Sequence, residues 1–281
     1  MPVTSPAYAL LADLLPDLRV AEGEPRSGPG WVTARQLAED RTALDAFIAL
    51  DADGITREYG GPPRPDVAAT LALHRYAWPA CLLFTMPWFL HRRVPRLPVA
   101  DVSLHRESGR MTVRTRSFHC LPGDPAAALP GARVLPTEAA LRDELRAALA
   151  EHLTPLLVAF KPLLRRGPRT LWGLATDEIS ESLWYVGRLM GREEQAVADL
   201  TALLPGGTAP YAGGAHFRGT PRLPARHGTR PVPEAKEAAE SGCARDRLTC
   251  CLFYTVSPDE TCASCPRRTE SDRIRRHASA A

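Results

Sequence analysis

"LPTEAALRDELRAALAEHLTPLLVAFKPLLRR", residues 135–166, is the stretch that decides the fold class. Its apolar residues recur every three or four positions, the spacing that places side chains on one face of an α-helix. The stripe expected to face the core consists of Leu141, Leu145, Ala148, Leu149 and Leu153. Thr137 precedes the stripe where an N-cap is expected. Pro155 lacks an N–H donor, so we expect it to kink or divide the helix.

Two more segments show helical spacing. The first starts at Asp66, with apolar residues at Val67, Leu71 and Tyr76, and becomes apolar on all sides near Cys81. The second runs from about residue 170 to residue 204, with Gly191 as the expected interruption. Its apolar residues on or near one face are Trp172, Leu174, Ile179, Leu183 and Val186. Tryptophans at helical spacing, here Trp172 and Trp184, are more often core residues than pocket residues.

A β-hairpin is predicted over about residues 100–118, "ADVSLHRESGRMTVRTRSF". Val102 and Leu104 alternate with polar neighbours, "RESGR" has turn composition, and apolar residues at Met111, Val113 and Phe118 follow. The first 65 residues are expected to form one or two short helices joined by loops. Together these segments predict an α+β fold that is predominantly helical, with a small antiparallel β-sheet or hairpin.

The chain divides by composition into three parts. Residues 1–204 form the predicted helical body with its hairpin. Residues 205–233 hold six glycines and six prolines, a composition typical of a loop, so we expect no regular element and assign 205–240 to a linker. Residues 241–281 form a C-terminal cysteine module that ends in a charged tail.

Composition excludes several classes of protein. An apolar fraction of 44% and a charged fraction of 24% over 281 residues are typical of soluble globular proteins. A net charge of +3 gives no reason to expect a nucleic-acid partner. The most apolar stretch, about residues 66–90, carries His74 and Arg75 and is interrupted by Pro79 and Pro87, so we predict no membrane span. The N-terminus has no signal-peptide pattern, and a cytoplasmic location is expected.

Four of the seven cysteines lie in "TCCLFYTVSPDETCASCPRR", residues 249–268. A disulfide between neighbouring cysteines closes a strained ring, and structural disulfides are rare in the cytoplasm. Structural zinc sites normally use two C-x₂₋₄-C pairs, and only Cys262 and Cys265 have that spacing. An iron–sulfur cluster is a larger target that also takes four thiolates. The residues alone leave these three interpretations open.

The arrangement Cys-Cys-x₁₀-Cys-x₂-Cys near the C-terminus, beginning with "CCLFY", resembles the FhuF family of siderophore-iron reductases. More loosely, "DVSLHRESGRMTVRT" and "RTLWGLATDEISESLWYVGR" resemble that family and the C-terminal region of siderophore synthetases. The resemblance implies a [2Fe–2S] cluster. Its implied ligands are Cys250, Cys251, Cys262 and Cys265.

The same resemblance implies an enzyme that reduces siderophore-bound Fe(III) by one electron and so releases iron in the cytoplasm. The implied partners are a ferric siderophore, with the hydroxamate type as our expectation, and a cytoplasmic electron donor such as a ferredoxin or flavin reductase. Some members contact the membrane peripherally, and no nucleic acid is expected. The resemblance identifies no substrate-binding residue, and we expect the helical body, residues 1–204, to be the chelate-binding region. The alternative is a non-enzymatic protein whose zinc knuckle or redox-sensing cluster serves partner binding.

Residues around the motif have simpler interpretations. The flanking arginines are Arg245, Arg247, Arg267 and Arg268. They would attract an acidic donor or an anionic chelate, but acidic residues lie among them, so we interpret them as solvated charges. Phe253 and Tyr254 are expected to pack the module onto the body. Cys81 is expected to be a buried apolar residue, Cys120 has no partner at metal spacing, and Cys243 is a candidate spare ligand.

Overall fold

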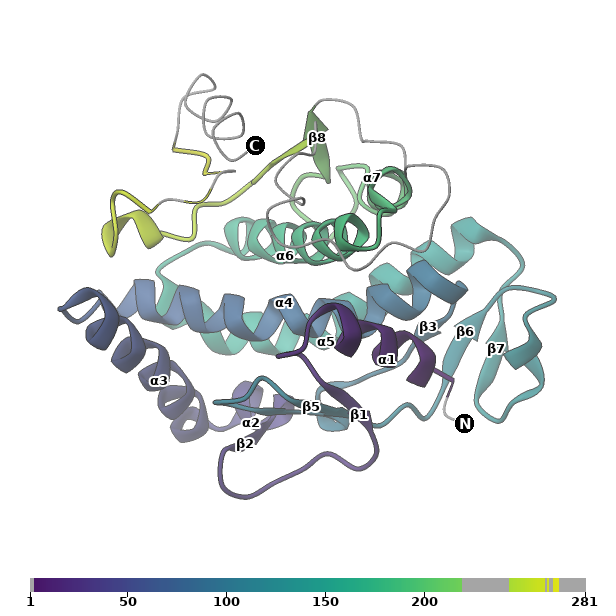
Figure 1. The fold of residues 1–281 in the computed structure, drawn as a ribbon, viewed down its shortest axis with the longest axis horizontal. Coiled ribbons are helices and arrows are strands. Elements are labelled where there is room, and N and C mark those ends of the chain that lie inside the picture. The colour runs from purple at the N-terminus through teal and green to yellow at the C-terminus, as the bar shows by residue number, and fades with distance from the viewer. Residues whose placement is uncertain (1–2, 219–242, 261, 263–264, 268–281) are drawn as a thin grey trace.

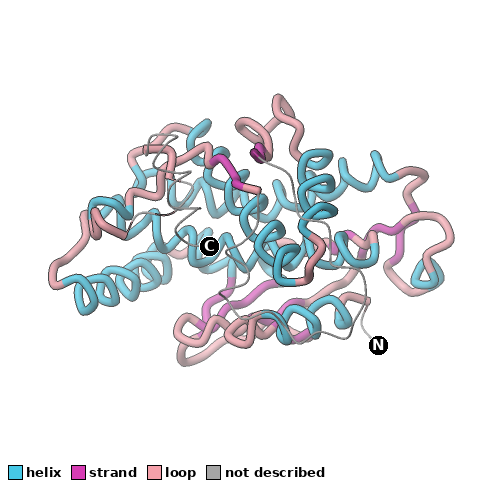
Figure 2. Tube along the Cα trace, turned by 45° about the horizontal axis from the view of Figure 1, so that its top comes forward, coloured by secondary structure: helices cyan, strands magenta, loops and turns pink. Residues whose placement is uncertain are grey.

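The computed structural model describes residues 3–218, 243–260, 262 and 265–267, and Figure 1 shows their arrangement. The helices of this part of the chain are α1 (Ser5–Leu14), α2 (Ala34–Glu39), α3 (Arg41–Tyr59), α4 (Pro65–His91), α5 (Glu138–Leu164), α6 (Pro168–Leu189) and α7 (Glu193–Leu203). Helices form most of the molecule, and short strands lie at the edges of the helical body (Figure 2). The predicted fold class, α+β and predominantly helical, is confirmed.

Helix α4 is the centre of the body, since α1, α3, α5 and α6 all pack against it. Its second half is buried on every side, as the sequence predicted from Cys81 onward. Two prolines lie inside the helix without ending it. Pro87 cannot donate to the carbonyl of Leu83, and the buried hydroxyl of Tyr8 donates to that carbonyl instead, over 2.9 Å. The side chain of α1 thus satisfies the acceptor that the proline leaves open.

Helix α5 begins where the sequence predicted. Thr137 is its N-cap, and the Thr137 hydroxyl accepts a hydrogen bond from the backbone N–H of Ala140 over 3.1 Å. All five residues of the predicted stripe are buried. The expectation that Pro155 divides the helix is wrong, because α5 continues through Pro155 to Leu164. Packing of the stripe against α4 outweighs the one hydrogen bond that the proline removes.

Helix α5 is also the one helix of the described residues whose length and composition would allow it to cross a membrane. This is weak evidence, because a core helix of a folded domain meets the same criteria. Here the apolar composition has a structural explanation: ten of the helix's residues are buried against the rest of the body.

The predicted hairpin is present as strands β4 (Val102–His105) and β5 (Met111–Val113), paired antiparallel with Val102 opposite Val113. Two strands that the sequence did not predict complete this sheet, β1 (Val20–Glu22) and β2 (Trp31–Thr33), in the order β1-β5-β4-β2. The expectation for the first 65 residues is therefore wrong in detail: three helices and two strands occupy them. These strands have three residues each, too short for alternation to be visible in the sequence.

A second sheet contains β3 (Val94–Pro95), β6 (Phe118–Cys120) and β7 (Ala132–Val134). Phe118, which we placed at the end of the hairpin, belongs to this second sheet. Two 3₁₀ turns, η1 (Val99–Asp101) and η2 (Pro125–Ala128), join these strands to their neighbours.

The predicted interruption at Gly191 is confirmed: it lies between α6 and α7 with a φ of 65°, where glycine is favoured. Beyond α7, the expectation of no regular element is wrong at β8 (His216–Arg218). This strand pairs antiparallel with β9 (Ala244–Asp246). Most of the predicted linker, residues 219–242, lies outside the described residues. The pairing of β8 with β9 starts the C-terminal segment on the surface of α6 and α7 (Figure 1).

Candidate functional site

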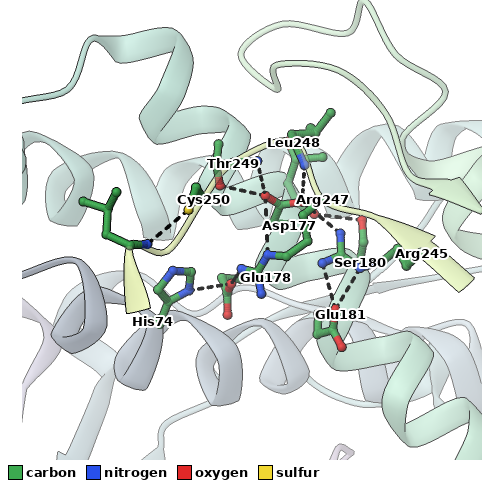
Figure 3. Close-up of polar contacts among 12 residues, drawn as sticks. His74, Asp177, Glu178, Ser180, Glu181, Arg245, Arg247, Leu248, Thr249 and Cys250 are labelled. Carbon is green, nitrogen blue, oxygen red and sulfur yellow. Dashed lines mark hydrogen bonds and ion pairs between the residues drawn. The ribbon is translucent and has the colours of Figure 1, made fainter. Parts of the chain in front are cut away.

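The backbone just before the adjacent cysteines is held by one buried carboxylate, that of Asp177 on α6 (Figure 3). Its Oδ2 accepts hydrogen bonds from the backbone N–H of Thr249 over 2.8 Å and from the Thr249 hydroxyl over 2.7 Å. Its Oδ1 accepts from the Leu248 N–H over 2.9 Å and from Arg245 Nη1 over 2.8 Å. The side chain of Asp177 has no solvent exposure. Four donors therefore fix the chain one residue before Cys250.

Two arginines of the C-terminal segment continue this contact into α6. Arg245 also pairs with Glu181 over 2.8 Å, and its side chain is only 2% exposed. Arg247 pairs with Glu178 over 3.0 Å. The interpretation of these two arginines as solvated charges is wrong. They are buried against acidic residues of α6, where each side chain has a charged partner.

Of the other two flanking arginines, Arg267 places its guanidinium 4.2 Å from the centre of the Tyr254 ring, a cation–π contact within the module. Arg268 lies outside the described residues.

Glu178 connects the C-terminal segment to α4. Its Oε1 is 2.6 Å from Nδ1 of His74 and 3.0 Å from Nη2 of Arg247 (Figure 3). Burial alone would raise the pKa of the Glu178 carboxyl, but the charges of His74, Arg247 and Arg245 together with the His74 hydrogen bond lower it below its usual value. The carboxylate is therefore ionised between two basic groups that come from different parts of the chain.

Gly173 allows the segment to approach α6 closely. A methyl group at this position would lie 2.8 Å from Cγ2 of Thr249, closer than real Cβ contacts. The glycine thus provides the space into which Thr249 fits when it bonds Asp177. Arg166 adds a further contact from just before α6, since its Nη2 donates to the carbonyl of Cys250 over 2.8 Å.

The adjacent cysteines are followed by a sharp change in backbone direction. Leu252 adopts the left-handed conformation with a φ of 67° and leads into the turn η4 (Phe253–Thr255). The Leu252 N–H donates to Sγ of Cys250 over 3.4 Å. The Phe253 N–H donates to the Cys251 side chain. Both sulfurs therefore accept backbone hydrogen bonds, although their residues are neighbours.

The turn η4 docks on the end of α3, as expected for Phe253. The Phe253 and Tyr59 rings pack edge to face with their centres 5.6 Å apart. The Tyr59 hydroxyl donates to Glu260 over 3.0 Å. The module therefore contacts α3 as well as α6.

The four motif cysteines lie close enough to interact. The thiol of Cys262 donates a hydrogen bond to Cys251, which lowers the pKa of Cys251 to about 5 despite its burial; the Phe253 N–H, Arg247 and His74 contribute further lowering. The same bond, together with burial, raises the pKa of Cys262. Burial also raises the pKa of Cys250, and the nearby sulfurs of Cys251 and Cys265 add to the effect. The backbone N–H of Cys265 donates to the carbonyl of Cys262 over 3.1 Å, which closes a turn between them.

One comparison with known proteins decides what this segment is. Residues 247–267 match the family model described as the FhuF 2Fe-2S C-terminal domain. The chain carries a FhuF 2Fe-2S domain. The predicted resemblance to that family is thereby confirmed, and the cofactor of the segment is a [2Fe–2S] cluster. No curated protein matches the chain.

The donor set of the FhuF 2Fe-2S domain fits this cofactor. A [2Fe–2S] cluster takes four thiolates spread over two irons, so it does not require that three of them meet at one point. In the part of the chain that the structure describes, no three His, Cys, Asp or Glu side chains form a group that could hold a single metal ion. The hydrogen bond from Cys262 favours the thiolate of Cys251, the form of cysteine that binds metal, and disfavours the thiolate of Cys262.

The remaining cysteines lie away from this group. Cys81 is fully buried in α4, as predicted, and Cys120 is buried in β6. Cys243 is 2% exposed, and burial next to Glu193 raises its pKa to about 11.

The sequence prediction missed the residues of α6 and α4 that hold the FhuF domain. Trp184 is 5% exposed and Trp172 packs on the core, as expected. Asp177 and Glu178, however, are buried on the same helix, and the sequence contains a signal for them. The run "TDEISES" places three acidic residues within the helix that carries the apolar stripe, and two of them, Asp177 and Glu178, are buried. Buried acids need partners, and here the partners are the arginines of the cysteine segment.

Proposed function

We propose that the chain is a ferric-siderophore reductase, an oxidoreductase that transfers one electron to siderophore-bound Fe(III). The observation that carries this proposal is the FhuF 2Fe-2S domain at residues 247–267. Its attachment to the helical body through Asp177 supports the proposal, because a site for electron transfer needs a fixed position relative to its substrate.

The proposed cluster ligands are Cys250, Cys251, Cys262 and Cys265. When bound, a [2Fe–2S] cluster supplies a carrier that accepts and donates one electron at a time. The contacts between Cys251 and Cys262, and the charge interactions of Cys265 with Cys250 and Cys262, support a single site for all four.

The surrounding residues have two roles in this proposal. The N–H groups of Leu252 and Phe253 donate to sulfur, and the charges of Arg247 and His74 lie near Cys251. Hydrogen bonds and positive charge near thiolates stabilise the more negative, reduced state. Asp177 and Gly173 act differently, since they hold the backbone that carries the ligands.

The substrate chemistry requires one electron and no acid or base residue of the protein. Hydroxamate and catecholate oxygens are hard donors that bind Fe(III) far better than Fe(II). One electron passes from a donor to the protein and from the protein to the chelate, Fe(III) becomes Fe(II), and the weakened chelate releases it. We propose a hydroxamate siderophore as substrate, a cytoplasmic ferredoxin or flavin reductase as donor, and a cytoplasmic location.

A single-turnover experiment tests the proposal. The protein is reduced without oxygen, freed of reductant and mixed with a ferric trihydroxamate in the presence of a coloured Fe(II) chelator. We expect reoxidation of the protein and capture of about one Fe(II) per cluster. The Cys262→Ser variant is the control and should transfer none. A protein that stays reduced beside ferric chelates is a cluster protein without this activity, and a redox-sensing role would replace the reductase.

A further inference from the structure

A second feature of the body lies next to the FhuF domain: a cavity of about 670 Å³ between the end of α1, helix α4, the turn joining β4 to β5, and helix α6. This volume is within the range of small-molecule sites, roughly 300–1,000 Å³. Leu14, Leu18 and Leu104 contribute apolar walls. Trp78 and Tyr185 contribute an aromatic wall, with ring centres 6.0 Å apart.

Two nitrogen atoms of cavity-lining residues are buried and have no hydrogen-bond partner among the described residues. They are Nε2 of His74 and Nε of Arg106. A buried polar atom without a partner costs free energy, so natural proteins leave few of them. Arg106 as a whole is only half-buried and lines the cavity, so its guanidinium is the donor that a ligand oxygen would meet there.

The charges around the cavity nearly cancel. Two arginines line it, Arg75 and Arg106, together with two acidic residues, Asp17 and Glu107. Arg75 is already paired with the buried Asp51 over 2.5 Å. The cavity therefore lacks the concentrated positive charge that a trianionic ligand requires, and it suits a ligand of near-zero net charge.

His74 connects the cavity to the proposed cluster site. It lines the cavity, and its Nδ1 is 2.6 Å from Glu178, which also bonds Arg247 (Figure 3). Arg247 and His74 both lie near enough to Cys251 for their charges to act on its thiol. A molecule in the cavity would therefore be separated from the cysteines by this short chain of side chains.

We propose that this cavity binds the ferric chelate, with Arg106 as a hydrogen-bond donor to its oxygens and Trp78 and Tyr185 against its apolar linkers. The ligand class is an uncharged oxygen-donor chelate, as three singly charged hydroxamates around Fe(III) produce. The assignment rests on the proposed reductase function, because it names the substrate site of that reaction. His74 then contacts both the substrate and the residues around the cluster.

Binding without electron transfer tests the site separately from the reaction. Gallium(III) has the charge and size of Fe(III) but is not reduced, so the gallium complex of a linear trihydroxamate reports binding alone. We expect saturable calorimetric binding to the holoprotein. The trianionic gallium tris-catecholate should bind more weakly, and tighter binding of the catecholate would overturn the proposed ligand class.

Variants locate the site. Arg106→Gln and Tyr185→Ala should each weaken gallium-trihydroxamate binding by about tenfold or more while the visible cluster spectrum stays unchanged. Arg110→Gln is the matched control: it lies on the same turn but does not line the cavity, and its affinity should equal that of the wild type. Arg169→Gln tests a second cavity of about 460 Å³ beside Cys250 and should also bind normally.

Wild-type affinity in both Arg106→Gln and Tyr185→Ala would overturn the site, as would selective loss of binding in Arg169→Gln. In either case single-turnover reduction by the wild type would leave the reductase proposal standing. Absence of gallium-chelate binding, with reduction of the ferric chelate intact, also overturns the site alone. Absence of both binding and reduction overturns the site and the reductase proposal together.

Discussion

Replacing Asp177 by asparagine removes one negative charge and changes almost nothing in size. The carboxylate accepts four hydrogen bonds, two on each oxygen, from Arg245, Leu248 and Thr249. Asparagine has one acceptor oxygen, so two of the four donors would face its NH₂ group instead. The Arg245 cation, 2% exposed, would also lose one of its two acidic partners.

The magnitude follows from these contacts. Each buried donor left without an acceptor costs about 1–3 kcal/mol. Two such donors give about 2–6 kcal/mol, in line with about 3–5 kcal/mol for breaking a buried ion pair. The helical body has its own core, so we expect most of this cost to appear as local opening of residues 245–250. A change of 3–5 kcal/mol corresponds to an opening constant about a hundredfold to several thousandfold larger.

Amide hydrogen exchange measures that opening directly, because the N–H groups of Leu248 and Thr249 donate to Asp177. In Asp177→Asn these amides should exchange faster by the stated factor, while amides of α5 keep their wild-type rates. Loss of iron to a chelator should accelerate as well. The matched control is Asp45→Asn, which removes an exposed partner of Arg41 and should change stability by less than about 0.5 kcal/mol. Equal exchange of the Leu248 and Thr249 amides in both variants would refute the anchoring role of Asp177.

Three further predictions concern other positions. Gly173→Ala should lower the melting temperature and the retention of the cluster, because its methyl group would lie 2.8 Å from Thr249. Gly54→Ala, whose methyl group would have no neighbour within 4 Å, should gain up to about 1 kcal/mol of helix stability. Equal shifts of the melting temperature in the two variants would contradict this. Leu252→Gly should keep or raise the free energy of unfolding in urea, and Leu252→Val should lower it by about 1–2 kcal/mol, because a φ of 67° disfavours branched side chains. A more stable Leu252→Val than Leu252→Gly would contradict the backbone argument. Burial lowers the pKa of His152 from 6.5 to about 4, so its neutral form stabilises the fold above pH 6.5 and this contribution is lost as the pH falls toward 4. Relative to His152→Gln, the free energy of unfolding of the wild type in urea should fall by about 3 kcal/mol over that window. A difference between the two proteins that stays constant with pH would contradict this.

The long helices could be predicted from the sequence because each presents a regular apolar stripe to one core. The stripe of α5 and the N-cap at Thr137 were both correct. Pro155 was misjudged because a local rule cannot weigh one lost hydrogen bond against the packing of a whole helix. The strands β1 and β2 could not be predicted, since three residues carry too little alternation and their partners lie about 70 to 90 positions away.

The family of the cysteine segment could be predicted from the sequence, but the residues that hold the segment on the body could not. Arg245 and Arg247 were interpreted as solvated because acidic residues surround them in the sequence. Their partners are instead on α6, 64 to 69 positions earlier. Ion pairs over such separations depend on the tertiary fold, which the local sequence around the arginines does not show.

We propose a reductase whose [2Fe–2S] cluster is held by four cysteine thiolates. Its most direct test is the visible and EPR spectrum of protein purified without oxygen, recorded before and after dithionite, with iron, sulfide and zinc quantified. We expect a brown protein with about two iron and two sulfide per chain and a spin-half signal on reduction. Cys262→Ser should lose this spectrum. A colourless wild-type protein that reconstitutes no cluster and binds about one zinc per chain would contradict the ligand assignment and, with it, the reductase.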